Sequence, residues 1–195
     1  MIKSKSDLNY YLQEDRKVNL WDPDMSAIAL LAKLFYKSSD AIAYDYLKKL
    51  RYLEYALNCR KKGPVGHLYY WWRRMLWSRA GFRYNISIGP NEIGYGFRIL
   101  HAGVGGGMII NCKSMGNYCI ANQGLVIGNK NGDDENRATI GDYVEFTPGV
   151  KVVGKLTIGN NVKVAPNSVV IKSIPDNCVV SGVPAMVIKK DGEKV

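Results

Sequence analysis

The chain has 195 residues, a formal net charge of +10 and 47% hydrophobic residues. This is the size of one domain with a small appendage, and no apolar run approaches the roughly 20 residues of a membrane span. The first residues are polar and contain no signal-peptide core, so we expect a cytoplasmic protein. The charge favours an acidic partner: a phosphorylated cofactor, an anionic glycan, a membrane surface or nucleic acid. No CxxC pair occurs, and we expect reduced, packed thiols at Cys59, Cys112, Cys119 and Cys178.

Residues 1–82 contain all four tryptophans and are predicted to form an N-terminal α-helical domain. Short polar residues that cap helix N-termini, and Gly-Pro breaks, set the expected boundaries. The four predicted helices run from Ser6-Asp7 to about Arg16, from Ser26 through AIALLAKLFY, from Ser38-Ser39-Asp40 to Lys61-Lys62-Gly63-Pro64, and from about Gly66 to Gly81.

A six-residue period dominates the second half of the chain. Neither a helix of period 3.6 nor a plain strand of period 2 produces this spacing. It predicts a left-handed parallel β-helix over residues 83–188, in which each hexapeptide covers one face and its apolar residue points to the axis. A basic tail, 189–195, is expected to follow. The periodic residues are Ile140, Phe146, Val152, Ile158, Val164 and Val170.

The same period is predicted upstream, with two interruptions. The earlier positions are expected to be Ile93 and Ile99, then Ile109, Met115, Ala121 and Ile127. The spacing leaves extra residues around 101–107 and again around 129–139. Because insertions in a solenoid form loops, and loops carry sites, both excursions are candidate site regions.

Two histidines are present in the chain. His67 lies in the aromatic helical segment, where we expect it to be packed or to cap a helix. His101 lies in the first excursion, within ILHAGVGGGMIIN. A neutral imidazole suits removal of a proton from a hydroxyl near neutral pH, so His101 is the candidate general base.

These features resemble the hexapeptide acyltransferases. The residues that carry the resemblance are the hexapeptide period, the loop histidine and the closing phrase VVSGVPAMVIKK. The chain looks most like serine acetyltransferase-like proteins, particularly the short-helix members associated with polysaccharide biosynthesis. The resemblance implies a homotrimer with acetyl-CoA as donor between adjacent subunits, no required metal, and His101 as the base.

The resemblance also implies which residues contact acetyl-CoA. Backbone groups would stabilise the oxyanion and line the pantetheine arm, and Lys189 would meet the 3′-phosphate. Two of these turns contain a proline, Pro148 and Pro166, and each proline removes one N–H donor. The expected donor-binding residues are Gly128, Asn129, Pro148, Gly149, Ala165, Gly182 and Lys189.

Departures from serine acetyltransferases bear on the acceptor. Leu100 stands where they have an aspartate before the histidine, Glu135-Asn136-Arg137 stands for Asp-Arg-His, and Asn85 stands for an upstream aspartate. An amino-acid zwitterion needs charged partners, since burying either charge alone is costly. We therefore expect a sugar or glycan precursor of the capsular or exopolysaccharide type as acceptor, with Asn85, Asn111 and Arg137 binding it.

Alternatives remain open at this stage. The enzyme could be a serine O-acetyltransferase of cysteine biosynthesis, or the β-helix could be a non-catalytic trimeric scaffold. A carbonic anhydrase on this fold needs three histidines on zinc, and scattered basic residues argue against nucleic-acid binding. The tryptophans and arginines of the last helix suggest a second role, peripheral contact with the inner face of the membrane. Packing of this helix against the protein is the simpler explanation.

Overall fold

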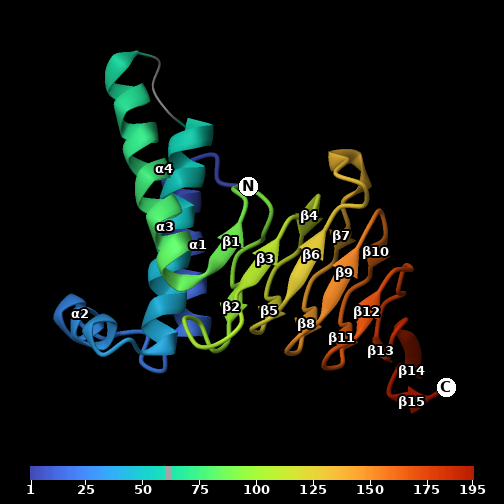
Figure 1. Ribbon diagram of the computed structural model, residues 1–195. Helices are drawn as coiled ribbons and strands as arrows, with labels where there is room; N and C mark the ends of the chain where they lie inside the picture. The colour runs from blue at the N-terminus through green and yellow to red at the C-terminus, as the bar shows by residue number, and fades with distance from the viewer. Residues whose placement is uncertain (60–62) are drawn as a thin grey trace.

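The computed structural model describes residues 1–59 and 63–195. Four helices stand at one end of a parallel β-helix, whose strands follow one another toward the C-terminus (Figure 1). The helices are α1 (Lys5–Asn19), α2 (Ala27–Phe35), α3 (Ser39–Cys59) and α4 (Pro64–Tyr84).

The β-helix has three faces. The five-stranded sheet contains β1 (Ile86–Ile88), β3 (Met108–Ile110), β6 (Val126–Gly128), β9 (Lys151–Val153) and β12 (Val169–Val170). The three-stranded sheet contains β4 (Ser114–Met115), β7 (Thr139–Ile140) and β10 (Thr157–Ile158). The seven-stranded sheet contains β2 (Arg98–Ile99), β5 (Ile120–Ala121), β8 (Glu145–Phe146), β11 (Lys163–Val164), β13 (Cys178–Ser181), β14 (Met186–Lys190) and β15 (Glu193–Lys194).

The core confirms the predicted β-helix after a helical region. The six periodic residues from Ile140 to Val170 are each at most 3% exposed, and they stack on equivalent residues of the neighbouring turn. Each turn therefore buries the apolar layer of the one before it, which is the main source of stability in a solenoid.

The predicted register is wrong at Ile109, which is 50% exposed. Its neighbour Ile110 is buried and pairs with Ile127. Met115 follows Ile110 by five positions, as Ile93 follows Ile88, whereas Ile158 follows Val152 by six, so the spacing of buried residues across this corner is not constant. A one-residue slip moves a strand's side chains to the opposite face, so counting back in sixes selected the outward residue.

Helix boundaries agree with the predictions in part. Ser26 caps α2 as expected, with its hydroxyl accepting from the Ala29 amide, but α1 is capped by Ser4 instead of Ser6 and Asp7. The predicted last helix is longer at both ends, running from Pro64 to Tyr84. Lys61 and Lys62, in the predicted end of the third helix, lie outside the described residues.

Buried charges join the helices to the first turn of the β-helix. Arg51 on α3 is fully buried and donates to Asp15 on α1 at 2.7 Å and to Glu54 at 3.0 Å. Its guanidinium also donates to the Ile93 carbonyl at 3.1 Å, while Asp15 accepts from the Phe97 amide. The helices thus satisfy backbone groups that would otherwise be left at an open sheet edge.

Two of the three corners of the β-helix matter for the site. The first ridge is the line of corners where the chain passes from the seven-stranded to the five-stranded sheet. The second ridge is the line where it leaves the five-stranded sheet for the three-stranded one. Three-residue strands, about 10 Å long, separate the two ridges within one protomer.

No helix within residues 1–59 or 63–195 is long and apolar enough to cross a membrane. The four cysteines are free, and Cys112, Cys119 and Cys178 are buried. Residues 189–195, predicted as a tail, form the end of β14 and β15 in an antiparallel hairpin.

Candidate functional site

His101 lies on the first ridge, where the chain leaves β2. The preceding Leu100 amide still bonds to the Ala121 carbonyl at 2.9 Å, so the sheet ladder continues up to the histidine. His101 itself adopts a left-handed backbone, with φ of +57°, and is exposed. Its imidazole makes no hydrogen bond to the described residues of this protomer. The geometry presents a solvent-accessible imidazole at a fixed corner, as a general base requires.

The loop after His101 packs on two sides. On one side, a Cβ at Gly103 would lie 2.9 Å from Ile42 Cδ1 on α3. On the other, a Cβ at Gly107 would lie 2.5 Å from the Asn85 amide group. Glycine at these two places therefore allows the close approach that holds the loop against α3 and the end of α4.

Asn85 lies near His101. It ends α4 in a left-handed conformation, with φ of +57°, and its carbonyl accepts from the Met108 amide at 3.0 Å. A small hollow is lined by Asn85, His101 and Gln123 among others. An amide, and not a carboxylate, therefore lines the hollow together with the candidate base.

No charged side chain lines the His101 hollow among the described residues. Tyr84 lies at its edge, and its hydroxyl donates to Asp45 at 2.8 Å. Burial and this hydrogen bond raise the pKa of Tyr84 to about 12, so the phenol is neutral near pH 7. The hollow is therefore a neutral, polar environment.

Three of the expected donor-binding residues follow His101 along the first ridge: Pro148, Gly149 and Ala165. Gly182 lies in the turn after β13, next to this ridge, where its carbonyl accepts from the Val169 amide at 3.0 Å. Gly149 has φ of +79°, and with Pro148 before it the corner has the residue pattern of a type II turn. The Gly149 amide is bonded to the Gln123 carbonyl at 3.0 Å, and the Ala165 amide to the Val180 carbonyl at 2.9 Å. These N–H groups hold the turns together, so they are not free donors.

The other predicted residues lie on the second ridge. Gly128 ends β6 and Asn129 follows it, while Asn111 follows β3. Arg137 lies near the end of the long excursion, directly after a short 3₁₀ helix, η1 (Asp134–Asn136). One protomer therefore does not bring them to His101, because the five-stranded sheet lies between. Lys189 lies on β14, exposed and paired with Val179 of β13.

Glu92 is a residue of the second ridge that the sequence did not single out. Its carboxylate lies 3.8 Å from the Arg137 guanidinium and accepts from the Gly89 amide at 3.3 Å. Burial raises the pKa of Glu92 to about 7, although the hydrogen bond from the Gly89 amide and the charge of Arg137 both act to lower it. Arg137 also donates to the Asp134 carbonyl at 2.9 Å, so its orientation is fixed by its own loop.

Gln123 was also missed, although the repeat could have revealed it. It follows Ala121 by two positions, as His101 follows Ile99, and Ile99 pairs with Ala121 in the sheet. The register therefore places Gln123 one turn above His101 on the same ridge. No group of three or more potential metal ligands occurs in the part of the chain that the structure describes.

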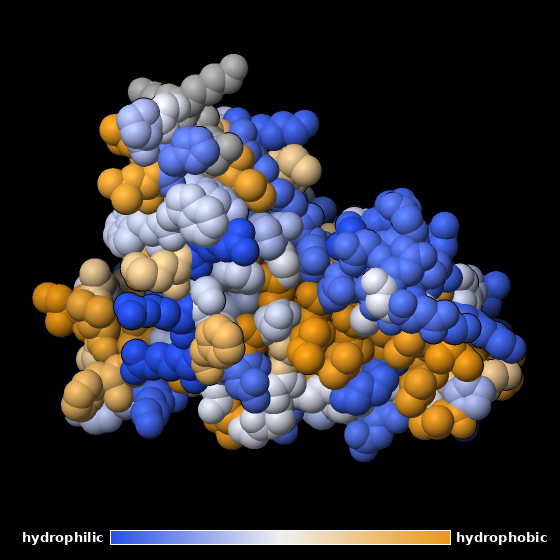
Figure 2. Space-filling view, turned by 45° about the horizontal axis from the view of Figure 1, so that its top comes forward, coloured by the Kyte–Doolittle hydropathy of each residue, from blue (hydrophilic) through white to orange (hydrophobic). Residues whose placement is uncertain are grey.

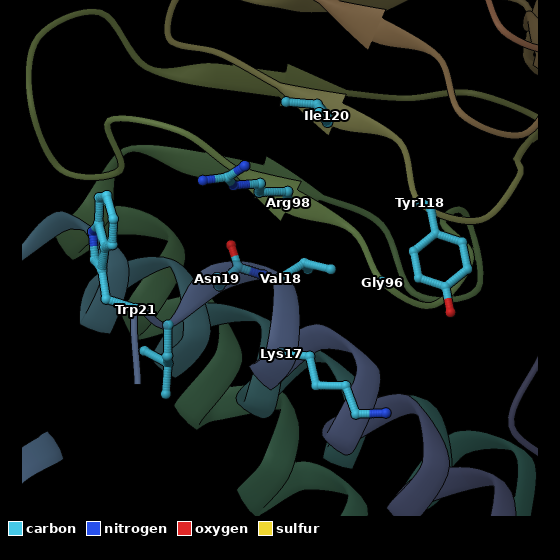
Figure 3. A pocket seen from close by; sticks show the side chains of 9 residues that line it. Lys17, Val18, Asn19, Trp21, Gly96, Arg98, Tyr118 and Ile120 are labelled. Carbon is cyan, nitrogen blue, oxygen red and sulfur yellow. The ribbon is translucent and has the colours of Figure 1, made fainter. Parts of the chain in front are cut away.

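A separate hollow lies between the end of α1 and the seven-stranded sheet (Figure 3). Arg98, Lys17 and Trp21 contribute to its lining, and the two cationic side chains point in different directions. It contains none of the predicted site residues. Lys17 is already paired with Glu14 at 2.6 Å, which leaves no convergent charge for a ligand.

The outer surface of the five-stranded sheet is largely apolar, although Ser87 and Lys151 also face outward on it. Ile109, Val153 and Ile171 are 50%, 39% and 53% exposed, and Figure 2 shows apolar side chains gathered on the β-helix next to the hydrophilic excursion. The equivalent outward residues of the three-stranded sheet are Ser114, Thr139 and Thr157. The apolar sheet lies between the two ridges and is suited to contact another molecule.

Comparison with known proteins finds similarity to serine acetyltransferases. No family model matches the chain. It is 34% identical over 113 residues to a serine acetyltransferase of Synechococcus elongatus, a match covering 56% of this chain and 45% of the relative. A serine acetyltransferase of Staphylococcus xylosus is 28% identical over 195 residues, covering 98% of this chain and 79% of the relative.

Solved structures agree on the fold. Serine acetyltransferase of Brucella abortus superposes with a TM-score of 0.66 at 21% identity, covering 96% of this chain and 71% of that one. The enzyme of Neisseria gonorrhoeae gives 0.68 at 22% identity, covering 98% and 68%. A further Brucella abortus structure, with a TM-score of 0.64 at 20% identity, is a complex with coenzyme A and covers 98% of this chain and 70% of that one.

The chain therefore has the β-helix fold of these solved structures and is similar in sequence to serine acetyltransferases. Since the matched part covers less than half of the first relative, the fold and this likeness are what the comparison establishes. The relatives named here do not support the predicted polysaccharide-biosynthesis subgroup, because their names point to serine. The expected class of enzyme, an acetyl-CoA-dependent O-acyltransferase, agrees with them.

Proposed function

We propose that the chain is an acetyl-CoA-dependent O-acetyltransferase in which His101 is the general base. The observation that carries this proposal is the position of His101, which is exposed at the start of the loop on the first ridge and lines a hollow together with Asn85. The imidazole takes the proton of an acceptor hydroxyl, and the oxygen attacks the thioester carbonyl. Collapse of the tetrahedral intermediate releases the CoA thiolate, which takes the proton back from the imidazolium.

The second ridge would be supplied by a neighbouring copy in a homotrimer. One protomer holds His101 apart from Gly128, Asn129, Asn111 and Arg137, whereas the apolar sheet between the ridges offers a surface for subunit contact. Backbone N–H groups near Gly128 would then stabilise the oxyanion, an interaction whose loss typically costs ~2.7–4 kcal/mol. Lys189 would meet the 3′-phosphate of CoA as an exposed cation.

Two acceptors are proposed. L-serine is favoured by the names of the relatives. A saccharide hydroxyl is favoured by the His101 hollow, which offers no charged side chain of this protomer to either end of an amino acid.

Release of the CoA thiol from acetyl-CoA tests the proposal. The chain is assayed with L-serine, with L-alanine as the matched acceptor that lacks a hydroxyl, and with free sugars and nucleotide sugars. We expect release that depends on a hydroxyl-bearing acceptor. Release with no acceptor in the panel, together with no acetyl-CoA binding by calorimetry, would favour the non-catalytic scaffold.

A further inference from the structure

A groove opens between the C-terminal half of α4 and the first two strands of the five-stranded sheet. Its volume, about 380 Å³, lies in the range of small-ligand sites. Asn85, Ile86 and Met108 line both this groove and the His101 hollow, so the two spaces adjoin. The full lining is Trp77, Ser78, Gly81, Phe82, Asn85, Ile86, Ser87, Met108 and Ile109.

Two aromatic side chains contribute to the wall on the α4 side. Trp77 is held in place, since its indole nitrogen donates to the Tyr46 hydroxyl at 3.1 Å, and that hydroxyl accepts from the Ile88 amide at 3.0 Å. Phe82 is 88% exposed and packs on nothing that covers it in the protomer. Both rings line the groove, one exposed and one held in place, and aromatic rings offer a binding surface of low conformational cost.

Polar groups occur at intervals among these apolar surfaces. The side chains of Ser78, Asn85 and Ser87 make no hydrogen bond to any described residue of the protomer. No ionisable side chain lines the groove among residues 1–59 and 63–195. A ligand held here would be neutral, with an apolar face and several hydroxyl groups around it.

α4 lies close enough to β1 to define the groove. A Cβ at Gly81 would be 2.9 Å from the Ile86 carbonyl oxygen, so only glycine permits this approach. The packing fixes the distance between the aromatic wall and the strands. The groove is thus already present where the helices meet the β-helix.

We propose that this groove is an extended acceptor subsite, continuous with His101, that binds a neutral pyranose ring. The C–H face of the sugar lies on Trp77 and Phe82, and its hydroxyls bond to Asn85, Ser78 or Ser87. This inference rests on the proposed acetyl transfer and narrows its acceptor. Free L-serine is small and doubly charged, and it gains nothing from such a surface.

The test uses Phe82→Ala, with Leu68→Ala as its matched control. Leu68 lies on the same helix, is 73% exposed, and is outside the groove. Phe82→Tyr keeps the ring and should behave like the wild type. The probes are methyl α-D-glucopyranoside and methyl α-D-galactopyranoside, whose binding is followed by NMR saturation transfer from protein to ring protons, with CoA present.

We expect saturation transfer to at least one glycoside in the wild type, Phe82→Tyr and Leu68→Ala. Phe82→Ala should weaken glycoside binding about three- to tenfold, the effect of losing one aromatic contact. Where the glycoside is acetylated, its KM should rise by the same factor while the KM for acetyl-CoA stays constant. No transfer to either glycoside, or equal binding by Phe82→Ala, would overturn the subsite.

The outcomes separate the two proposals. Loss of acetyl-CoA binding and of CoA release in the wild type would overturn the acetyltransferase, whatever the glycosides do. CoA release with L-serine, unaffected by Phe82→Ala, would leave the enzyme intact and overturn the subsite. A change of oligomeric mass confined to Phe82→Ala would show that the groove is a contact between copies, which also overturns it.

Discussion

The β-helix and its joint with the helices are stabilised by opposite chemistry. Each turn of the β-helix stacks an apolar residue on the residue at the equivalent position of the turn before. Phe146, for example, lies between Ala121 and Val164. At the joint, Arg51 and Asp15 are fully buried charges that bond to each other and to the first turn. Repetition builds the solenoid, whereas one unrepeated polar cluster fixes the helices to its end.

The two kinds of burial differ in how they respond to loss of one partner. Removing an apolar group costs its transfer free energy plus a cavity term. Removing one member of a buried ion pair leaves the other charge uncompensated. Although burial lowers it, the carboxylates of Asp15 and Glu54 raise the pKa of Arg51 above its ordinary value, so the guanidinium is charged across the accessible range.

Arg51→Ala should have the largest effect on stability, about 3–5 kcal/mol, because Asp15 and Glu54 lose their counter-charge. We expect the loss to be local. Hydrogen exchange should accelerate in α1, α3 and β2 while β9 to β12 stay protected. Uniform loss of protection would show that the joint and the solenoid unfold as one unit.

Ile158→Ala tests the repetitive side of the comparison. Ile158 is fully buried and pairs with Ile140 in the preceding turn, so we expect the free energy of unfolding to fall by about 2–5 kcal/mol. Thermal unfolding at fixed protein concentration measures it, and exchange should now accelerate around β7 and β10. Ile28→Ala, at a position on α2 that is 80% exposed, is the control for the size of the deletion.

Glu92 gives the stability a pH dependence. Its pKa is raised from 4.5 to about 7 by burial, so above pH 4.5 the unfolded chain ionises first. Stability falls as pH rises from about 4.5 to 7 and stays reduced above, by up to about 3 kcal/mol.

Glu92→Gln should remove this fall, so that the stability of the variant relative to the wild type increases as pH rises. Melting temperatures between pH 4.5 and 8 measure the difference, with exposed Glu135→Gln as control. Parallel curves for the wild type and Glu92→Gln would contradict the assigned titration.

Lys163→Ala should have the smallest effect. Lys163 pairs with Glu145 at 2.9 Å across the seven-stranded sheet, and its side chain is 53% exposed. Exposed pairs contribute about 0–1 kcal/mol and weaken with salt. A loss above 2 kcal/mol in the melting experiment would show that outward charges stabilise the β-helix more than this account allows.

The sequence predicted the β-helix because its chemistry repeats. Six residues from Ile140 to Val170 were placed correctly in the core, and Ile109 failed because the step across its corner, from Ile110 to Met115, is five positions and not six. The joint could not be predicted, because it brings Asp15, Arg51 and Phe97 together from distant parts of the chain with no period to reveal them.

The candidate site divides in the same way. His101 and Asn85 were predicted and lie together, because both flank the first turn of the solenoid. Asn111 and Arg137 lie on the second ridge, and their meeting with His101 depends on a neighbouring copy that no single-chain pattern specifies. Phe82 was not predicted, because the sequence does not distinguish an exposed aromatic residue of a helix that lines a groove from one that does not.

His101→Ala, compared with His67→Ala, tests the central claim most directly. His67 is the other histidine and is exposed on α4, away from the ridge. We predict that His101→Ala lowers the turnover of acceptor-dependent CoA release about 10²–10⁴-fold, with unchanged oligomeric mass and acetyl-CoA binding, while His67→Ala keeps wild-type turnover. Wild-type turnover by His101→Ala would contradict the assignment of the base and, with it, the site proposed on the first ridge.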